Sequence, residues 1–223
     1  MSFETLEAVI APPVIPVLTI EDADDAVPLA RALAAGGLTT VEVTLRTPAA
    51  LEAIGAIAAE VPEAVVGAGT IVQSQQIGAA LEAGAQFLVS PGSTSALLDA
   101  LQEAEVPFLP GAATPSEILG LLERGITVAK LFPAYAVGGI RLLSALAGPF
   151  PEFRFCPTGG IDLRLACDYL ALSNVSCVGG SWMAPAQAVR SGNWQAIQGL
   201  ARTAAALAPA ALAPVTAAPA AGT

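Results

Sequence analysis

The chain contains no histidine and only one lysine, Lys130, among its 223 residues. Without histidine it cannot form Ser–His or Cys–His nucleophile pairs, HExxH metal sites or histidine-rich zinc sites. Every other cationic side chain is arginine, which stays protonated, whereas a lysine amine can lose its proton and attack a carbonyl. Lys130 is therefore a candidate nucleophile. Chance survival of one lysine in a lysine-poor genome is the alternative that composition leaves open.

Charge is also scarce, at 13% of residues, and the formal net charge is −10. This balance argues against nucleic-acid and anionic-membrane partners, so an anionic ligand must be held by a few local groups. Residues 8–20 are apolar but too short to span a membrane. A secretory signal would require a basic residue near the N-terminus, and none precedes Arg31. The three cysteines, Cys156, Cys167 and Cys177, lack metal or CxxC spacing. We expect reduced core thiols in a cytoplasmic protein.

Short β-branched or aromatic runs alternate with helical segments rich in alanine and leucine. The expected strands are Val14–Leu18, Thr40–Thr44, Val65–Gly67, Phe87–Ser90, Phe108–Pro110, Thr127–Phe132, Phe153–Pro157 and Ser176–Val178. Eight such units predict an α/β protein with a single (β/α)8 TIM barrel over residues 1–202. An open doubly wound sheet is the rival, although no GxGxxG follows the first strand. Residues 203–223 form an Ala/Pro-rich tail that we expect to be mobile.

Several helix boundaries can be predicted from local motifs. Glycines precede three strands at expected left-handed helix ends: Gly36 or Gly37, Gly84 and Gly125. Thr47-Pro48 suggests an N-cap with proline at the first helical position, and residues 114–117 (TPSE) form a capping box. Pro28 predicts a helix that begins late or bends.

The chemically useful residues fall at strand ends, where barrel active sites form. Lys130 lies in the apolar sequence TVAKLFP, where burial would favour its neutral form. In VEVTLRT, alternation turns Glu42 toward the barrel axis, so it could shuttle protons beside Lys130, and Arg46 could hold a carboxylate. An ionised Glu42 would oppose the effect of burial on the amine. The alternative is that these residues form structural ion pairs.

Two glycine-rich segments, Thr158-Gly159-Gly160 and Gly179-Gly180-Ser181, follow the last two expected strands. Exposed backbone N–H groups at this position form the usual phosphate site of such barrels. Binding here would depend on amide donors and hydroxyls. Ordinary tight turns are the alternative.

These residues belong to a longer series of motifs, EVTLRT, VGAGT, SPG, AKLFPA, FCPTGGI and VGGSW, in order from about Val14 to Trp194. The series resembles the 2-keto-3-deoxy-6-phosphogluconate (KDPG) aldolases, a family also active on 4-hydroxy-2-oxoglutarate. The resemblance implies a cytoplasmic homotrimer of the Entner–Doudoroff pathway. It would cleave KDPG reversibly to pyruvate and glyceraldehyde 3-phosphate through a Schiff base, without metal or organic cofactor.

The resemblance also implies residue roles: Lys130 as the Schiff-base former, Glu42 as general acid/base, Arg46 and Thr70 as carboxylate contacts, Pro91 in the pocket wall, Phe132 beside the imine, and Thr158, Gly159, Gly160, Gly180 and Ser181 at the hydroxyl and phosphate end. Tyr135 falls at a variable family position that bears on substrate preference. Two alternatives stay open. One is another pyruvate-dependent aldolase with a galactonate-derived or unphosphorylated substrate, and the other is a catalytically silent ligand-binding barrel. Substrate preference, stereochemistry and the need for phosphate are not fixed by the sequence.

Overall fold

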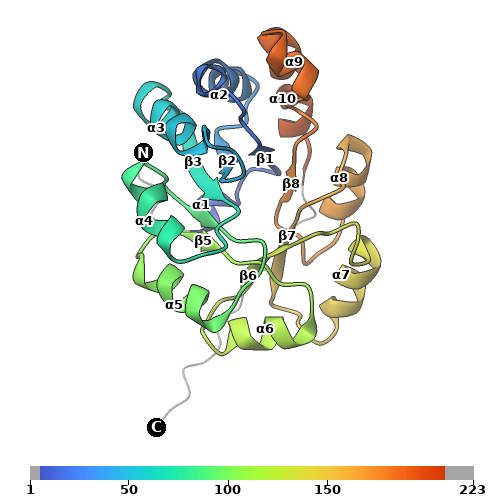
Figure 1. The fold of residues 1–223 in the computed structure, drawn as a ribbon. Helices are drawn as coiled ribbons and strands as arrows, with labels where there is room; N and C mark the ends of the chain where they lie inside the picture. Colours follow the sequence, from blue (N-terminus) through green and yellow to red (C-terminus); the bar gives the residue numbers. More distant parts are fainter. Residues whose placement is uncertain (1–5, 209–223) are drawn as a thin grey trace.

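The computed structural model describes residues 6–208 as a ring of parallel strands surrounded by helices (Figure 1). The strands are β1 (Val14–Leu18), β2 (Thr40–Thr44), β3 (Val65–Gly69), β4 (Leu88–Val89), β5 (Phe108–Leu109), β6 (Val128–Leu131), β7 (Arg154–Pro157) and β8 (Val178–Gly180). All eight expected strands are therefore present.

The strands close into a barrel. One sheet has the order β5-β4-β3-β2-β1-β8, and β6 pairs with β7 in a second. Single bridges join the two sheets on both sides, with Gly111 pairing with Lys130 on one side and Thr158 with Gly179 on the other. The predicted (β/α)8 barrel is confirmed, and the open doubly wound sheet is wrong.

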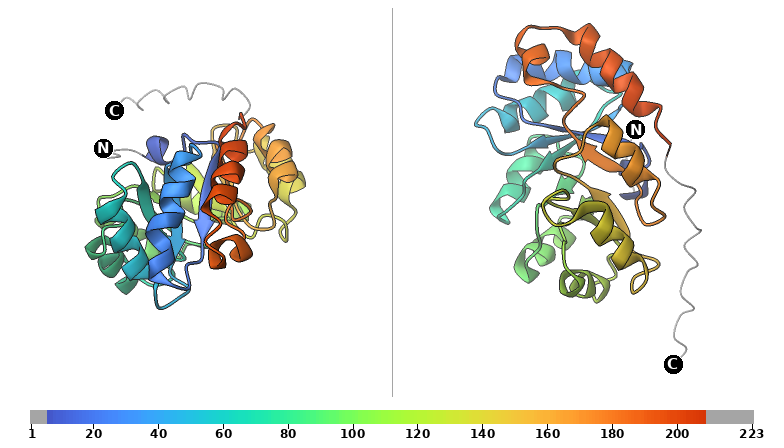
Figure 2. Two further views of the ribbon diagram at one scale, coloured as in Figure 1. Left: turned by 90° about the horizontal axis from the view of Figure 1, so that it is seen from above. Right: turned by 90° about the vertical axis from the view of Figure 1, so that its right-hand side faces the viewer.

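The helices lie outside the strands. They are α1 (Leu6–Val9), α2 (Ala26–Ala35), α3 (Ala50–Glu60), α4 (Gln75–Glu82), α5 (Ser95–Glu103), α6 (Pro115–Leu122), α7 (Gly139–Ala147), α8 (Leu163–Leu170), α9 (Ala186–Arg190) and α10 (Trp194–Ala205), with a short 3-10 helix, η1 (Ala23–Asp25), before α2. Figure 2 shows α10 beside α2, where the two ends of the barrel sequence pack together. Because α10 continues to Ala205, helical structure extends past residue 202, where we expected the barrel to end. Most of the expected tail, 209–223, lies outside the described residues.

Most predicted helix boundaries are confirmed. Gly37, Gly84 and Gly125 have φ values of 97°, 100° and 74°. The Thr114 hydroxyl accepts from the Glu117 backbone, and the Glu117 carboxylate accepts from the Thr114 backbone, which completes the capping box of α6. Pro28 lies in the first turn of α2, as a late helix start requires.

Two boundary predictions are wrong. Helix α3 begins at Ala50, because the Thr47 hydroxyl donates to the Ile20 carbonyl and is not used as a cap. Strand β8 begins at Val178, where we expected it to end, because its glycines pair with Ile15 and Pro16 of β1. The glycine pair is therefore part of the strand.

The core has two regions, separated by strand alternation. Val41 and Val43 face the helix layer. The barrel interior holds a smaller cluster that includes Phe87, Cys156 and Cys177. All three cysteines are free, but Cys167 is exposed, so the prediction of a core thiol is wrong there. Between residues 6 and 208, no helix is both long and apolar enough to cross a bilayer.

Candidate active site

A buried ion pair lies inside the barrel. The Lys130 ammonium on β6 donates to both carboxylate oxygens of Glu42 on β2, at 2.9 and 3.1 Å. Each residue is only 3% exposed. The Lys130 Nζ atom also lies 5.7 Å from the centroid of the Phe132 ring. An amine and a carboxylate in direct contact, largely shielded from water, can exchange a proton with each other.

The position of the Glu42 carboxylate depends on a glycine in the neighbouring strand. Gly69 on β3 lies so close that a Cβ atom there would overlap the Glu42 carboxylate. Strand β3 pairs in register with β2, with Glu42 opposite Gly67 and Thr44 opposite Gly69. Of the two glycines in VGAGT, Gly69 therefore leaves room for the acid that contacts Lys130, and Gly67 leaves room for the Phe87 ring.

Arg46 lies just beyond β2, and its Nε donates to the Thr70 hydroxyl at 3.0 Å. Thr70 has φ 62°, in the left-handed region that costs a β-branched residue energy. Strained backbone of this kind is concentrated at functional sites. The hydrogen bond orients the guanidinium while leaving its terminal nitrogens for a carboxylate.

A cavity of about 150 Å³ brings most of the predicted residues together. Its lining includes Arg46, Lys130, Phe132, Thr158, Gly159, Gly160, Gly180 and Ser181. Gly159 and Gly160 have φ values of 103° and 73°, a conformation that non-glycine residues adopt only with strain. The pocket therefore combines the Lys130 amine and the Arg46 guanidinium with a lining of glycine-rich backbone. These groups suit a ligand with anionic ends and a reactive carbonyl.

Pro91 does not line this cavity. It packs against Gly111, where an added Cβ would overlap the Pro91 backbone. Gly111 in turn bridges to Lys130, so Pro91 supports the lysine strand from behind. The role of Pro91 in the pocket wall stays a prediction.

The sequence analysis missed three lining residues: Val17, Thr19 and Ile161. Thr19 follows β1 directly, so the strand-end rule that identified the other residues also applied to it. Gly179 lies so close to Thr158 that a Cβ would overlap its hydroxyl.

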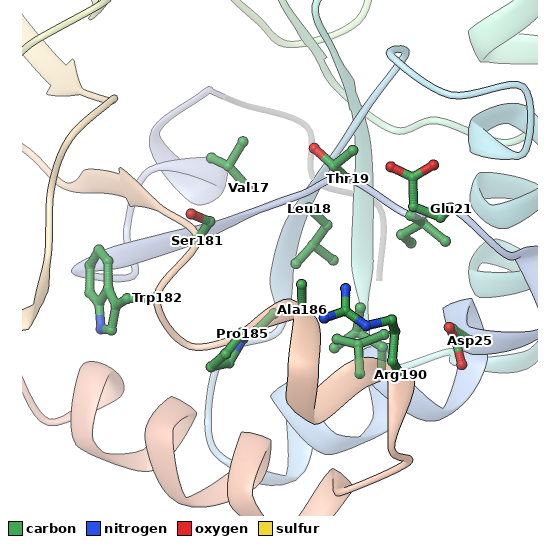
Figure 3. A pocket seen from close by; sticks show the side chains of 14 residues that line it. Val17, Leu18, Thr19, Glu21, Asp25, Ser181, Trp182, Pro185, Ala186 and Arg190 are labelled. Atoms are coloured by element: carbon green, nitrogen blue, oxygen red, sulfur yellow. The ribbon is translucent and has the colours of Figure 1, made fainter.

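A larger cavity of about 520 Å³ adjoins the first and shares Val17, Thr19 and Ser181 with it. Figure 3 shows it between the end of β1, the start of α2 and helix α9, with Arg190 and Asp25 on its far side. Desolvation, followed by the charges of Asp22 and Asp24, raises the pKa of Asp25. Lys130 lines the smaller cavity and not this one, so we place the chemistry in the smaller cavity.

The interior thiol of Cys177 is a poor nucleophile. A side-chain hydrogen bond with Cys156, together with burial, raises the pKa of the Cys177 thiol well above its usual value. A thiol in that state is protonated and unreactive. In the part of the chain that the structure describes, no three His, Cys, Asp or Glu side chains are grouped as metal ligands would be.

Known proteins share this arrangement of sequence and fold. The family described as KDPG and KHG aldolase matches residues 7–200. A 2-dehydro-3-deoxy-phosphogluconate aldolase of Dickeya dadantii is 52% identical over 200 residues, covering 90% of this chain and 94% of that protein.

Two solved structures have the same architecture. KDPG aldolase of Legionella pneumophila, with pyruvate captured as a covalent carbinolamine, superposes with TM-score 0.87 at 46% identity, covering 89% of this chain and 97% of that one. The Zymomonas mobilis aldolase with 3-phosphoglycerate has TM-score 0.87 at 45% identity, covering 93% and 98%.

Proposed function

Since the chain belongs to the KDPG and KHG aldolase family, we propose that it is a class I aldolase that reversibly cleaves KDPG to pyruvate and glyceraldehyde 3-phosphate. The observation that carries the proposal is the buried contact between Glu42 and Lys130, whose side chain lines a cavity together with Arg46. The same site would act on 4-hydroxy-2-oxoglutarate, giving pyruvate and glyoxylate.

Imine formation begins with a proton transfer within the ion pair. Glu42 takes a proton from the Lys130 ammonium across 2.9 Å, and the neutral amine adds to the C2 carbonyl of the substrate. Arg46 holds the neighbouring carboxylate with Thr70 behind it. Glu42 then returns a proton to the hydroxyl that departs as water, which leaves an iminium.

The iminium withdraws electrons from the bond to be broken. Glu42, now a carboxylate again, takes up the C4 hydroxyl proton, the aldehyde carbonyl forms, the C3–C4 electron pair moves into the new enamine, and the aldehyde leaves. Glu42 supplies the proton that converts the enamine carbon to a methyl group, and water hydrolyses the imine to release pyruvate. The covalent imine provides the electron sink, so no metal or organic cofactor takes part.

The opposite end of the cavity suits the substrate's phosphate. The backbone of Gly159, Gly160 and Gly180 and the hydroxyls of Thr158 and Ser181 line it. Backbone amides of this kind bind phosphate in many barrels. We assign Phe132 the role of packing beside the imine, in keeping with its position near the Lys130 amine.

Family membership also supports a wider proposal: a cytoplasmic homotrimer that acts in the Entner–Doudoroff pathway. We place the end of the barrel domain near residue 202, since the family match ends at residue 200 and α10 ends at Ala205. Sedimentation velocity of the full chain would measure the assembly.

Borohydride trapping tests the chemistry directly. Incubation with pyruvate and borohydride should fix one three-carbon adduct, and peptide mapping should place it on Lys130. The Lys130→Arg variant is the matched control, because it keeps the charge but cannot form the imine. An adduct on another residue, or on the variant, would overturn the assignment.

Substrate preference needs a second assay. Pyruvate release is measured with KDPG, its unphosphorylated analogue, a galactonate-derived substrate and 4-hydroxy-2-oxoglutarate. The proposal requires KDPG to give the highest kcat/KM. Pyruvate binding without turnover of any substrate would favour a silent barrel.

A further inference from the structure

Thr19 lies at the mouth of the reaction cavity, and its hydroxyl hydrogen is donated to the Thr44 hydroxyl. The Thr44 hydroxyl lies 2.9 Å from the Leu18 carbonyl oxygen and 3.1 Å from the Thr19 hydroxyl. A carbonyl oxygen can only accept, so the single Thr44 proton goes to Leu18. The hydrogen in the Thr19–Thr44 contact must then come from Thr19.

This arrangement makes the exposed Thr19 oxygen a hydrogen-bond acceptor. Thr44 is fully buried on β2, whereas Thr19 is exposed and lines the cavity that contains Lys130 and Arg46. Figure 3 shows Thr19 and Val17 on the same side of β1, with Leu18 pointing the opposite way. The Thr19 oxygen therefore presents only lone pairs to a ligand.

An oxygen that can only accept a hydrogen bond favours a substrate hydroxyl at this position. Lys130 and Arg46 are donors, suited to the carbonyl and carboxylate of a 2-keto acid. A carboxylate or a phosphate dianion also carries only lone pairs and would be repelled by the Thr19 oxygen. A substrate hydroxyl can donate to it.

The chemistry of the two substrates indicates which hydroxyl Thr19 meets. Val17 pairs with Glu42, level with the reacting amine, and Thr19 lies two residues, about 6–7 Å, further toward the mouth. Ser181 follows Gly180, which pairs with Pro16, so Thr19 lies nearer the mouth than Ser181 as well. Pyruvate carries no hydroxyl, and glyceraldehyde 3-phosphate carries one, on the carbon next to its aldehyde group. That hydroxyl is the substrate group able to donate to Thr19.

We propose that Thr19 is a specificity-determining residue that accepts a hydrogen bond from the hydroxyl on the carbon next to the aldehyde group of the acceptor. The inference rests on the proposed function. Thr19 does not act as a base. Its hydroxyl donates to Thr44, the Thr44 hydroxyl donates to the Leu18 carbonyl, and that carbonyl cannot take up a proton. Its effect is to favour hydroxylated aldehydes over deoxy ones.

The test compares two aldehydes in condensation with pyruvate: glyceraldehyde 3-phosphate and 3-phosphooxypropanal, which lacks only the hydroxyl in question. Thr19→Val preserves the shape of the side chain and removes its oxygen. It should lower kcat/KM for glyceraldehyde 3-phosphate about tenfold, the effect of one neutral hydrogen bond, and leave kcat/KM for the deoxy aldehyde unchanged. Thr19→Ser should restore the wild-type ratio.

Equal losses with both aldehydes, or no loss with either, would overturn the inference, because a merely structural role does not distinguish them. Thermal melting of both variants at the wild-type temperature would show that the fold is kept. Failure of the wild-type enzyme to condense pyruvate with either aldehyde would instead reject the proposed function itself.

Discussion

The Lys130 Nζ atom lies 2.9 Å from one carboxylate oxygen of Glu42 and 3.1 Å from the other, although 88 residues separate the two in sequence. The contact joins β6 to β2 across the barrel. A buried charge without a partner is strongly destabilising, so each residue requires the other. The pair also supplies the amine and the acid that imine chemistry needs.

Replacing Glu42 with glutamine should separate imine formation from turnover. Glutamine keeps the size and a hydrogen bond to Lys130 but cannot carry a proton, so kcat should fall about 10²-fold or more. Borohydride trapping of pyruvate should remain measurable. Glu63→Gln, at an exposed carboxylate, is the control. Unchanged turnover in Glu42→Gln would remove this residue from the mechanism.

Replacing Arg46 with lysine should weaken substrate binding. The planar guanidinium grips a carboxylate with two hydrogen bonds while its Nε donates to Thr70, and an ammonium cannot do both. The KM for pyruvate in condensation should rise about 10- to 100-fold, the effect of one or two charge-assisted hydrogen bonds. Arg164→Lys is the control, because its side chain is 79% exposed. A fall in kcat with unaltered KM would contradict the clamp.

Adding a methyl group at Gly69 should disturb the acid. The new Cβ would overlap the Glu42 carboxylate, so Gly69→Ala should lower the free energy of unfolding by about 1–3 kcal/mol and slow turnover. The matched control is Gly78→Ala in α4, where no atom lies within 4 Å of the added group. That variant should gain about 0.4–1 kcal/mol and keep full activity. Urea unfolding and kcat measure both; an active, stable Gly69→Ala enzyme would show that the contact is not needed.

Thiol alkylation should distinguish the three cysteines. Cys167 is exposed, Cys156 and Cys177 are buried, and the raised pKa of Cys177 keeps it protonated at pH 8. Iodoacetamide should therefore modify Cys167 alone in the folded protein and all three residues in urea. Cys167 and Cys177 share the tryptic peptide 165–190, so fragmentation of that peptide in the mass spectrometer locates the label. Rapid labelling of Cys177 in the folded state would contradict the packing.

The positions of Glu42, Lys130 and Arg46 in the barrel could be predicted from the sequence because two simple rules decide them. Strand alternation turns Glu42 inward and Val41 and Val43 outward, and chemistry gathers where parallel strands end. Those rules identified Lys130 and Arg46 without knowledge of the barrel diameter. The same rule applies to Thr19, which the sequence analysis missed, and the role of Thr19 depends on a contact with Thr44 that only the closed barrel defines.

Other features were beyond the reach of local patterns. Thr47-Pro48 has the chemistry of an N-cap, yet a nearby carbonyl, that of Ile20, takes the threonine hydroxyl. Pro91 belongs to a recognisable motif, but its place behind Gly111 follows from how two strand ends pack. In both cases a tertiary contact decided the outcome, and no window of sequence contains its two partners.

Lys130 also occupies the place where β6 meets the end of β5. Its backbone N–H donates to the Pro110 carbonyl at 2.8 Å, and its own carbonyl accepts from Ala112 at 2.9 Å. The ring of strands is thus completed through the very residue that would bear the covalent intermediate. Loss of these β5–β6 hydrogen bonds would move the Lys130 amine away from Glu42 while the outer helices were still formed. Catalytic activity should therefore fall before helix content does when the barrel opens at this junction.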